Sequence, residues 1–168
     1  GARAMGHTRL KVWIVRGVEA GGAKGERGAG RLVNQMLQRG GPLPREIGTR
    51  KSLENGAAIV AATGGSTNAA LHLPALANEA GLSFTIDDVG EVFARTPLIG
   101  NLRPGGKYTA KDVYDIGGTA VVIRALVESG HIDGNCLTIT GRTIAQEYGQ
   151  ANAPDGEIMY TVRQPIMP

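Results

Sequence analysis

Aromatic residues and cysteines are scarce in this chain, and each scarcity excludes a class of structure. Phe, Trp and Tyr make up 4% of the 168 residues, which is too few for a small binding module built around an aromatic core. The single cysteine, Cys136, excludes an intramolecular disulfide and any all-cysteine metal or cluster site made by this chain alone. A reducing, cytoplasmic setting is the default expectation for such a sequence.

Long apolar runs are also missing. No stretch approaches the roughly 20 residues of a membrane span, and the first residues lack the apolar core of a signal peptide. The net positive charge comes from residues 1 to 51, which have 11 Lys and Arg against 3 acids, whereas residues 52 to 168 have 7 against 12. Trp13 alone accompanies the basic residues, so we expect neither a nucleic-acid nor a membrane partner.

Glycine is abundant, with 26 residues, and it accompanies Ala, Val, Ile and Leu in a pattern typical of an α/β enzyme. Residues 1 to 30 are basic and glycine-rich, and we expect them to be poorly ordered. Residues 31 to 134 have mainly helical patterns. From Asn135 the pattern changes, and strands are predicted over residues 136 to 140 and 158 to 162, so 135 to 168 forms a separate, β-rich part.

Capping residues locate the helices of the middle part. Thr49 precedes a helix over residues 50 to 62, and Thr85 with Asp88 forms a capping box for residues 86 to 95. Further helices are predicted at residues 31 to 38, 109 to 116, 119 to 129 and 143 to 148.

The stretch from residue 61 to 81 contains the main candidate site. Gly64 and Gly65 lead to Ser66, a good N-cap for a helix that ends at Gly81 and that Pro74 should bend or interrupt. A helix start has N–H groups without internal partners and about half a positive charge, so this corner can receive a carboxylate or phosphate. A purely structural cap is the commoner role of such a turn.

Other candidate residues have simpler structural interpretations. His72 has no partner ligands in the sequence and is expected at the core or its rim. Asp87 and Asp88 are adjacent on a helix, so they point apart and complement the helix dipole. Cys136 lies in an apolar, β-branched run and is expected to be a buried small hydrophobe. A second Gly-Gly turn precedes Thr119. Like the first, it can face a ligand or can simply cap the following helix.

Several blocks of this sequence closely resemble the dihydroxy-acid dehydratase and phosphogluconate dehydratase family. The resemblance covers about residues 31 to 165, and its most specific blocks are GGSTNA and CLTITGRT, in that order and spacing. Residues 1 to 30 do not resemble the segment expected before the match. On this basis we expect the chain to be an internal fragment: the C-terminal part of a large α/β domain, followed by the start of a smaller β-rich domain.

The resemblance implies a dehydratase that converts a 2,3-dihydroxy acid to a 2-keto acid in branched-chain amino-acid biosynthesis. Such an enzyme uses an iron-sulfur cluster as Lewis acid and a magnesium ion, and acts as a cytoplasmic homo-oligomer on a small-molecule hydroxy acid. An aldonic acid or phosphogluconate dehydratase is the alternative within the family. From another class, the alternative is a non-catalytic anion-binding or assembly module.

The family's cluster cysteines, most magnesium ligands and catalytic serine come from segments that have no matching positions here. The resemblance therefore gives this chain no catalytic or metal-binding residue, and we expect the chain alone to be inactive and to bind no cluster. Its expected contribution is to substrate binding, at the corner that contains Gly65, Ser66, Thr67 and Asn68.

Overall fold

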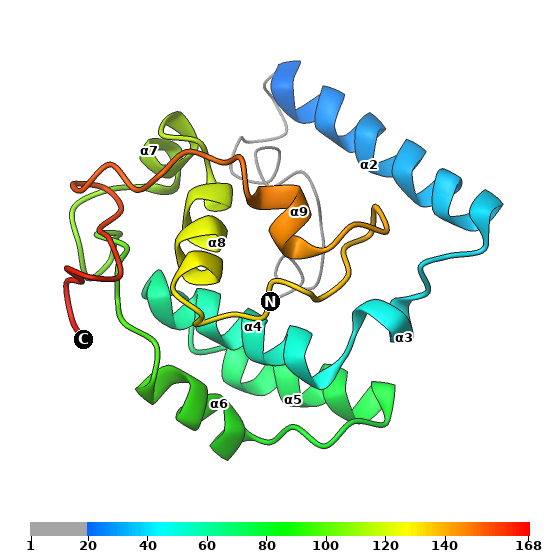
Figure 1. Cartoon of the computed structure of the whole chain (residues 1–168), viewed down its shortest axis with the longest axis horizontal. Coiled ribbons are helices and arrows are strands. Elements are labelled where there is room, and N and C mark those ends of the chain that lie inside the picture. The colour runs from blue at the N-terminus through cyan, green and yellow to red at the C-terminus, as the bar shows by residue number, and fades with distance from the viewer. Residues whose placement is uncertain (1–19) are drawn as a thin grey trace.

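The computed structural model describes the backbone of residues 20 to 168 and the side chains from residue 30 onward (Figure 1). Over these residues the backbone forms helices and isolated β-bridges, without a strand of several residues. In chain order the helices are α2 (Ala20–Arg39), α3 (Pro44–Ile47), α4 (Arg50–Ala62), α5 (Ala69–Ala80), α6 (Ile86–Ala94), α7 (Ala110–Asp115), α8 (Thr119–Glu128) and α9 (Ile144–Tyr148). None of these helices is both long and apolar enough to cross a membrane.

Helix α4 is the centre of the core. It packs against α5, α6 and α8, and α8 in turn packs against α9. Ala57, Ala58 and Ala62 of α4 are fully buried, and their small side chains allow the neighbouring helices to approach closely. Larger side chains fill the space between the helices: Leu53, Leu73, Val89, Val121, Ile123 and Leu126.

Threonine caps begin three of the helices, and the two that were predicted as caps, Thr49 and Thr85, are confirmed. The Thr49 hydroxyl accepts a hydrogen bond from Ser52 N at 3.2 Å, at the start of α4. At α6 the Asp88 carboxylate accepts from Thr85 N at 2.6 Å, and Asp88 N donates to the Thr85 hydroxyl at 3.3 Å. Thr143 caps α9 in the same way. These local bonds satisfy N–H groups that a helix start leaves unpaired, which is why the sequence located these helices closely.

Helices α2 and α5 differ from the prediction. Helix α2 begins at Ala20, so residues 20 to 30 are helical where poor order was expected; residues 1 to 19 lie outside the described residues. Once a helix has nucleated, each added residue gains a hydrogen bond, and this offsets the cost of the glycines. Helix α5 continues through Pro74, because burial of Leu73 and Ala77 on its inner face outweighs the one missing hydrogen bond.

The predicted β-rich part is not observed. Within residues 135 to 168 the only regular element is α9, and residues 136 to 140 and 158 to 162 make single bridges, including Leu137 with Thr143. A strand needs a neighbour along its length, and here the pairing stops after one bridge. The described part of the chain is therefore mainly helical, and the α/β class of the larger domain stays a prediction.

One extended segment, residues 98 to 101, lies between the end of α4 and the C-terminal residues. Ile99 N and Gly100 N both donate to Ala62 O at 2.9 Å. On its other side, Tyr160 N donates to Ile99 O at 2.8 Å, and Leu98 pairs with Met167. This segment therefore joins residues far apart in sequence and fixes the position of the turn that follows α4.

Candidate functional site

The two glycines of the predicted corner terminate α4. Gly64 has a left-handed backbone with φ of +58°, and its N–H donates to Ala61 O at 3.1 Å. Gly65 N donates to Val60 O at 2.8 Å. This pair of bonds is a Schellman motif, in which glycine is favoured at the left-handed position. The glycine pair thus has a sufficient structural explanation at the end of α4.

Ser66 is not the N-cap of α5, which begins three residues later, after Asn68. Ala69 N donates to Ser66 O at 3.2 Å, and Ala70 N donates to Thr67 O at 2.9 Å, so a tight turn leads into the helix. The Ser66 hydroxyl accepts from Asn68 N at 3.2 Å. Ser66, Thr67 and Asn68 are all residue types that favour the N-cap position, so the sequence alone does not show where α5 begins.

The turn changes which groups can bind an anion. The first N–H groups of α5, from Ala69 to His72, all donate to backbone carbonyls of residues 66 to 68. Among residues 20 to 168, no acceptor is found for the N–H groups of Ser66 and Thr67. Residues 64 to 68 are all exposed. The free donors at this corner are therefore these two N–H groups, two hydroxyls and the Asn68 amide, rather than the helix start itself.

The position of the corner is fixed by close packing at Gly100. A Cβ atom at Gly100 would lie 3.1 Å from Thr63 Cα and 3.4 Å from Leu102 Cδ1. A Cβ atom at Gly64 would lie 3.4 Å from Leu98 Cδ1. Thr63 and Gly64 thus contact residues 98 to 102, and the four predicted site residues, Gly65 to Asn68, follow them directly in the chain.

The second Gly-Gly turn is covered by another segment. Asn152 Nδ2 donates to Ile116 O at 2.9 Å and lies 3.1 Å from where a Cβ atom of Gly117 would be. Gly118 is buried, and the Thr119 hydroxyl is enclosed without a hydrogen-bond partner in the described part of the chain. This turn is therefore part of the packed structure and not an open corner.

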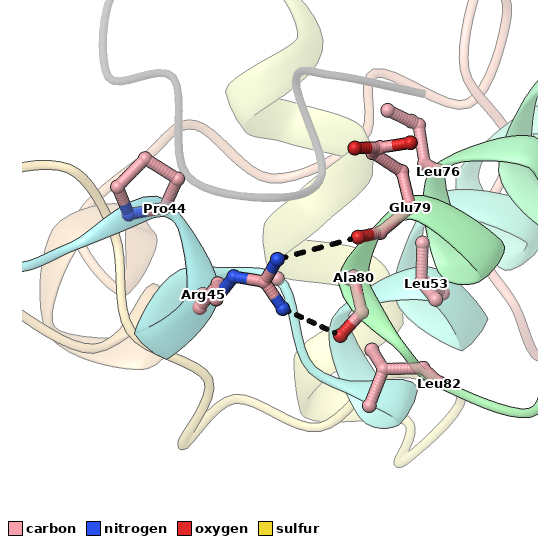
Figure 2. Close-up of a pocket in the computed structure, with 8 residues that line it drawn as sticks. Pro44, Arg45, Leu53, Leu76, Glu79, Ala80 and Leu82 are labelled. Atoms are coloured by element: carbon pink, nitrogen blue, oxygen red, sulfur yellow. Dashed lines mark hydrogen bonds between the residues drawn. The ribbon is translucent and has the colours of Figure 1, made fainter.

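A groove of about 290 Å³, which was not predicted from the sequence, lies between α3, α4 and α5 (Figure 2). Its walls are mostly apolar and include Leu53, Leu76 and Leu82. Arg45 lies at one side, where Nη1 donates to Ala80 O at 3.1 Å and Nη2 to Glu79 O at 3.5 Å. The arginine thus complements the C-terminal carbonyls of α5, a structural role. The groove was missed because its two walls are some thirty residues apart in sequence.

The remaining candidate residues are held by structural contacts or lie at the surface. Asp88 binds Arg50 Nη2 at 2.7 Å as well as capping α6. Cys136 is 9% exposed, and burial, together with the nearby Asp133 carboxylate, raises the pKa of its thiol. His72 is exposed, rather than at the core or its rim as expected. None of these residues is arranged as a nucleophile or an acid–base pair.

Comparison with known proteins now identifies the family. The family profile described as "Dihydroxy-acid/6-phosphogluconate dehydratase N-terminal" matches residues 3 to 147. The chain belongs to this family. The match includes residues 3 to 30, so the expectation that residues 1 to 30 do not resemble the family is wrong. The division into residues 1 to 30, 31 to 134 and 135 to 168 stays a prediction.

The relatives carry the same family name. A protein named Dihydroxy-acid dehydratase 3 from Bradyrhizobium diazoefficiens is 75% identical over 167 residues, which cover 99% of this chain and 29% of the relative. Dihydroxy-acid dehydratase 2 from Bordetella bronchiseptica is 56% identical over 140 residues, covering 83% of this chain and 25% of the relative. The chain thus spans between a quarter and a third of the length of these relatives.

The cofactors that the family resemblance implies do not fit the residues described here. An iron-sulfur cluster needs several thiolates, and the sequence has one cysteine, which is buried and has a raised pKa. Within residues 20 to 168, no group of three or more His, Cys, Asp or Glu side chains could hold a metal ion. We therefore assign no reaction step in this chain to either cofactor.

Proposed function

We propose that the whole protein dehydrates a 2,3-dihydroxy acid to a 2-keto acid, as a step of branched-chain amino-acid biosynthesis in the cytoplasm. The observation that carries this proposal is the 75% identity to a protein named dihydroxy-acid dehydratase across nearly all of this chain. In this proposal the protein is a homo-oligomer, and residues outside this chain bind the iron-sulfur cluster and magnesium. The chain contributes to the binding of a small hydroxy acid.

Within that function, Gly65, Ser66, Thr67 and Asn68 bind the substrate carboxylate. The free N–H groups of Ser66 and Thr67, the two hydroxyls and the Asn68 amide are hydrogen-bond donors. None of them ionises near neutral pH, so they can hold a carboxylate without giving up a proton to it. Gly65 has no side chain to obstruct the approach of the ligand. The corner is exposed, and the residues just before it pack closely against residues 98 to 102.

Two alternatives follow from specific observations. The family profile names 6-phosphogluconate beside dihydroxy acids, so a sugar-acid or phosphogluconate substrate is the alternative within the enzyme class. The described residues form a donor-rich corner without an acid–base pair, which also suits a non-catalytic anion-binding or assembly module. Both alternatives predict anion binding, and only the first predicts turnover.

Turnover by the full-length protein separates these functions. Cluster-loaded protein should convert a branched 2,3-dihydroxy acid to the 2-keto acid, measured as its hydrazone, more efficiently than it converts gluconate or 6-phosphogluconate. The reverse preference would assign the sugar-acid activity. Absence of turnover with all three acids, in protein whose absorbance shows a complete cluster, would favour the non-catalytic module.

The variant Ser66→Ala tests the corner. If the hydroxyl binds the substrate carboxylate, kcat/KM should fall by an amount equivalent to about 1.5 to 3 kcal/mol, the range for a hydrogen bond to a charged group. Ser83→Ala is a matched control, because Ser83 is also exposed and lies shortly before a helix. Unchanged kinetics in Ser66→Ala, with a loss of stability of up to about 1 kcal/mol, would make the corner purely structural.

A further inference from the structure

The loop from Asn101 to Tyr108 is closed by its own hydrogen bonds. Tyr108 N donates to Asn101 O at 2.9 Å, and Arg103 N donates to Tyr108 O at 2.8 Å. Across the loop, Lys107 N donates to Asn101 Oδ1 at 3.1 Å. The loop tip is thus fixed by both the backbone and the side chain of Asn101.

Gly106 shows how tightly the loop is closed. Its N–H donates to Leu102 O at 2.8 Å. A Cβ atom at this position would lie 2.5 Å from the carbonyl carbon of Asn101 and 2.6 Å from Leu102 N, which is too close for any side chain. The loop therefore has a defined backbone, and the residues on either side of Gly106 have a defined relative position.

Two cations share this loop. Arg103 Nε donates to Lys107 O at 3.2 Å, so the base of the guanidinium group is held against the lysine backbone. Lys107 Nζ lies 5.1 Å from the centre of the Tyr108 ring, an uncharged partner. Both side chains belong to exposed residues. Two positive groups thus belong to one closed loop, and each has a partner within it.

These cations lack an acidic partner in the described structure. Over residues 20 to 168, neither Arg103 nor Lys107 has a carboxylate within the 4.0 Å of an ion pair, although six other basic residues do. These six are Arg50, Lys51, Arg95, Lys111, Arg124 and Arg142.

Two acids of the C-terminal segment, Asp155 and Glu157, have hydrogen-bond partners of their own. The Glu157 carboxylate accepts a hydrogen bond from the Tyr108 hydroxyl. The Asp155 carboxylate accepts from the backbone N–H groups of Ile158 and Met159, at 3.1 and 2.8 Å. Glu157 thus lies at the hydroxyl of the ring that Lys107 contacts, but neither of these acids is within 4.0 Å of a cation of the loop.

We propose that Arg103 and Lys107 form a binding site for an oxyanion, the carboxylate or phosphate group of a small molecule. The free edge of a guanidinium group can donate two parallel hydrogen bonds to such a group, and the ammonium group adds a second charge. The site does not depend on the proposed dehydratase activity, since it is a property of the loop itself.

The proposal is tested by titrating the chain with inorganic phosphate and, separately, with acetate, while backbone amide signals are followed by NMR. We expect saturable shifts centred on residues 103 to 107, and the tighter of the two ligands identifies the preferred oxyanion. Arg103→Gln and Lys107→Gln should each weaken binding by about tenfold, which corresponds to the loss of one charge-assisted hydrogen bond. Arg103→Lys should lose less than Arg103→Gln.

Arg163→Gln is the matched control, because Arg163 is also exposed and has no ion pair within the described residues but lies outside the loop. Its titration should equal that of the unmodified chain. Equal weakening in Arg163→Gln would mean that net charge alone attracts the anion and would overturn the proposal, as would shifts that do not saturate. Lys107→Gln removes no hydrogen bond that holds the loop, so its result stands even if Arg103→Gln disturbs folding.

Discussion

Asn55 and Asp133 exchange two hydrogen bonds across 78 residues of sequence. Asn55 Nδ2 donates to Asp133 O at 2.9 Å, and Asp133 N donates to Asn55 Oδ1 at 2.8 Å. The side chain of Asn55 is thus paired with a backbone unit in the way that one strand pairs with another. Since Asn55 is only 2% exposed, this pair fixes the segment between α8 and α9 against the centre of α4.

Replacing Asn55 by alanine should lower the free energy of unfolding by about 2 to 3 kcal/mol, because two backbone groups lose their partners in a buried place. Urea unfolding, followed by circular dichroism, measures the change. Asn78→Ala is the control: Asn78 is exposed on α5 and should change stability by less than about 0.5 kcal/mol. Equal effects in the two variants would contradict this assignment.

The capping carboxylate of Asp88 should make stability depend on pH. Hydrogen bonds from Thr85 N, Arg50 and the Thr85 hydroxyl lower the pKa of Asp88 in the folded protein. Its contribution is therefore complete above the pKa of the unfolded chain, about 3.9, and is lost as the pH falls through the lower folded value. Asp88→Asn should destabilise the protein at pH 7, and the difference should shrink as the pH falls below 4.

Asp87→Asn is the control for that experiment, because it removes an acid from the same first turn of α6 without removing the capping hydrogen bonds. Its stability difference at pH 7 should be smaller than that of Asp88→Asn. A difference for Asp88→Asn that is constant from pH 7 to pH 2 would show that the carboxylate charge does not matter.

Two glycines should respond to alanine in opposite directions. Gly64→Ala should cost about 1 kcal/mol, because Gly64 has a φ of +58° that residues with a Cβ atom adopt only with strain. Gly90→Ala should stabilise the protein by about 0.5 to 1 kcal/mol, since Gly90 lies within α6 and has nothing within 4 Å of where a Cβ atom would be. Compared with the unmodified protein, the denaturant midpoint should fall for Gly64→Ala and rise for Gly90→Ala.

Cys136 should be an unreactive thiol in the folded protein. Burial restricts access and raises the pKa of the thiol, so little thiolate is present at pH 8. Reaction with a disulfide reagent should be slow in buffer and should become fast in concentrated urea. A rate in buffer equal to that of a short cysteine peptide would show that the thiol is accessible.

The helices with a clear capping residue were predictable from the sequence. Thr49 and Thr85 start α4 and α6 where expected, because each cap is a contact over three residues that the sequence shows directly. The start of α5 was not predictable to the residue, because Ser66, Thr67 and Asn68 can all cap a helix. Only the Schellman turn before them and the bonds after them decide where α5 begins.

Features that depend on distant residues were not predictable in this way. The expected strand over residues 158 to 162 is instead an extended segment that pairs with residues 99 to 101, whose position depends on the end of α4. The closure of the loop with Arg103 and Lys107 depends on the Asn101 side chain, which no local sequence pattern indicates. Residues 64 to 68 form an exposed turn, and their role in ligand binding stays a prediction. The backbone N–H groups without an acceptor in the described residues are those of Ser66 and Thr67, and not those at the start of α5 as expected.

The pairing of residues 98 to 101 on both sides has a consequence for the order in which the protein folds. Helices α4, α5 and α6 are consecutive and pack mainly on one another, so they can associate while later residues are still being synthesised. Residues 98 to 101 can bond to Ala62 at that stage, but their other edge stays open until residues 158 to 167 leave the ribosome. During synthesis, this open edge is the part of the chain most exposed to wrong pairing.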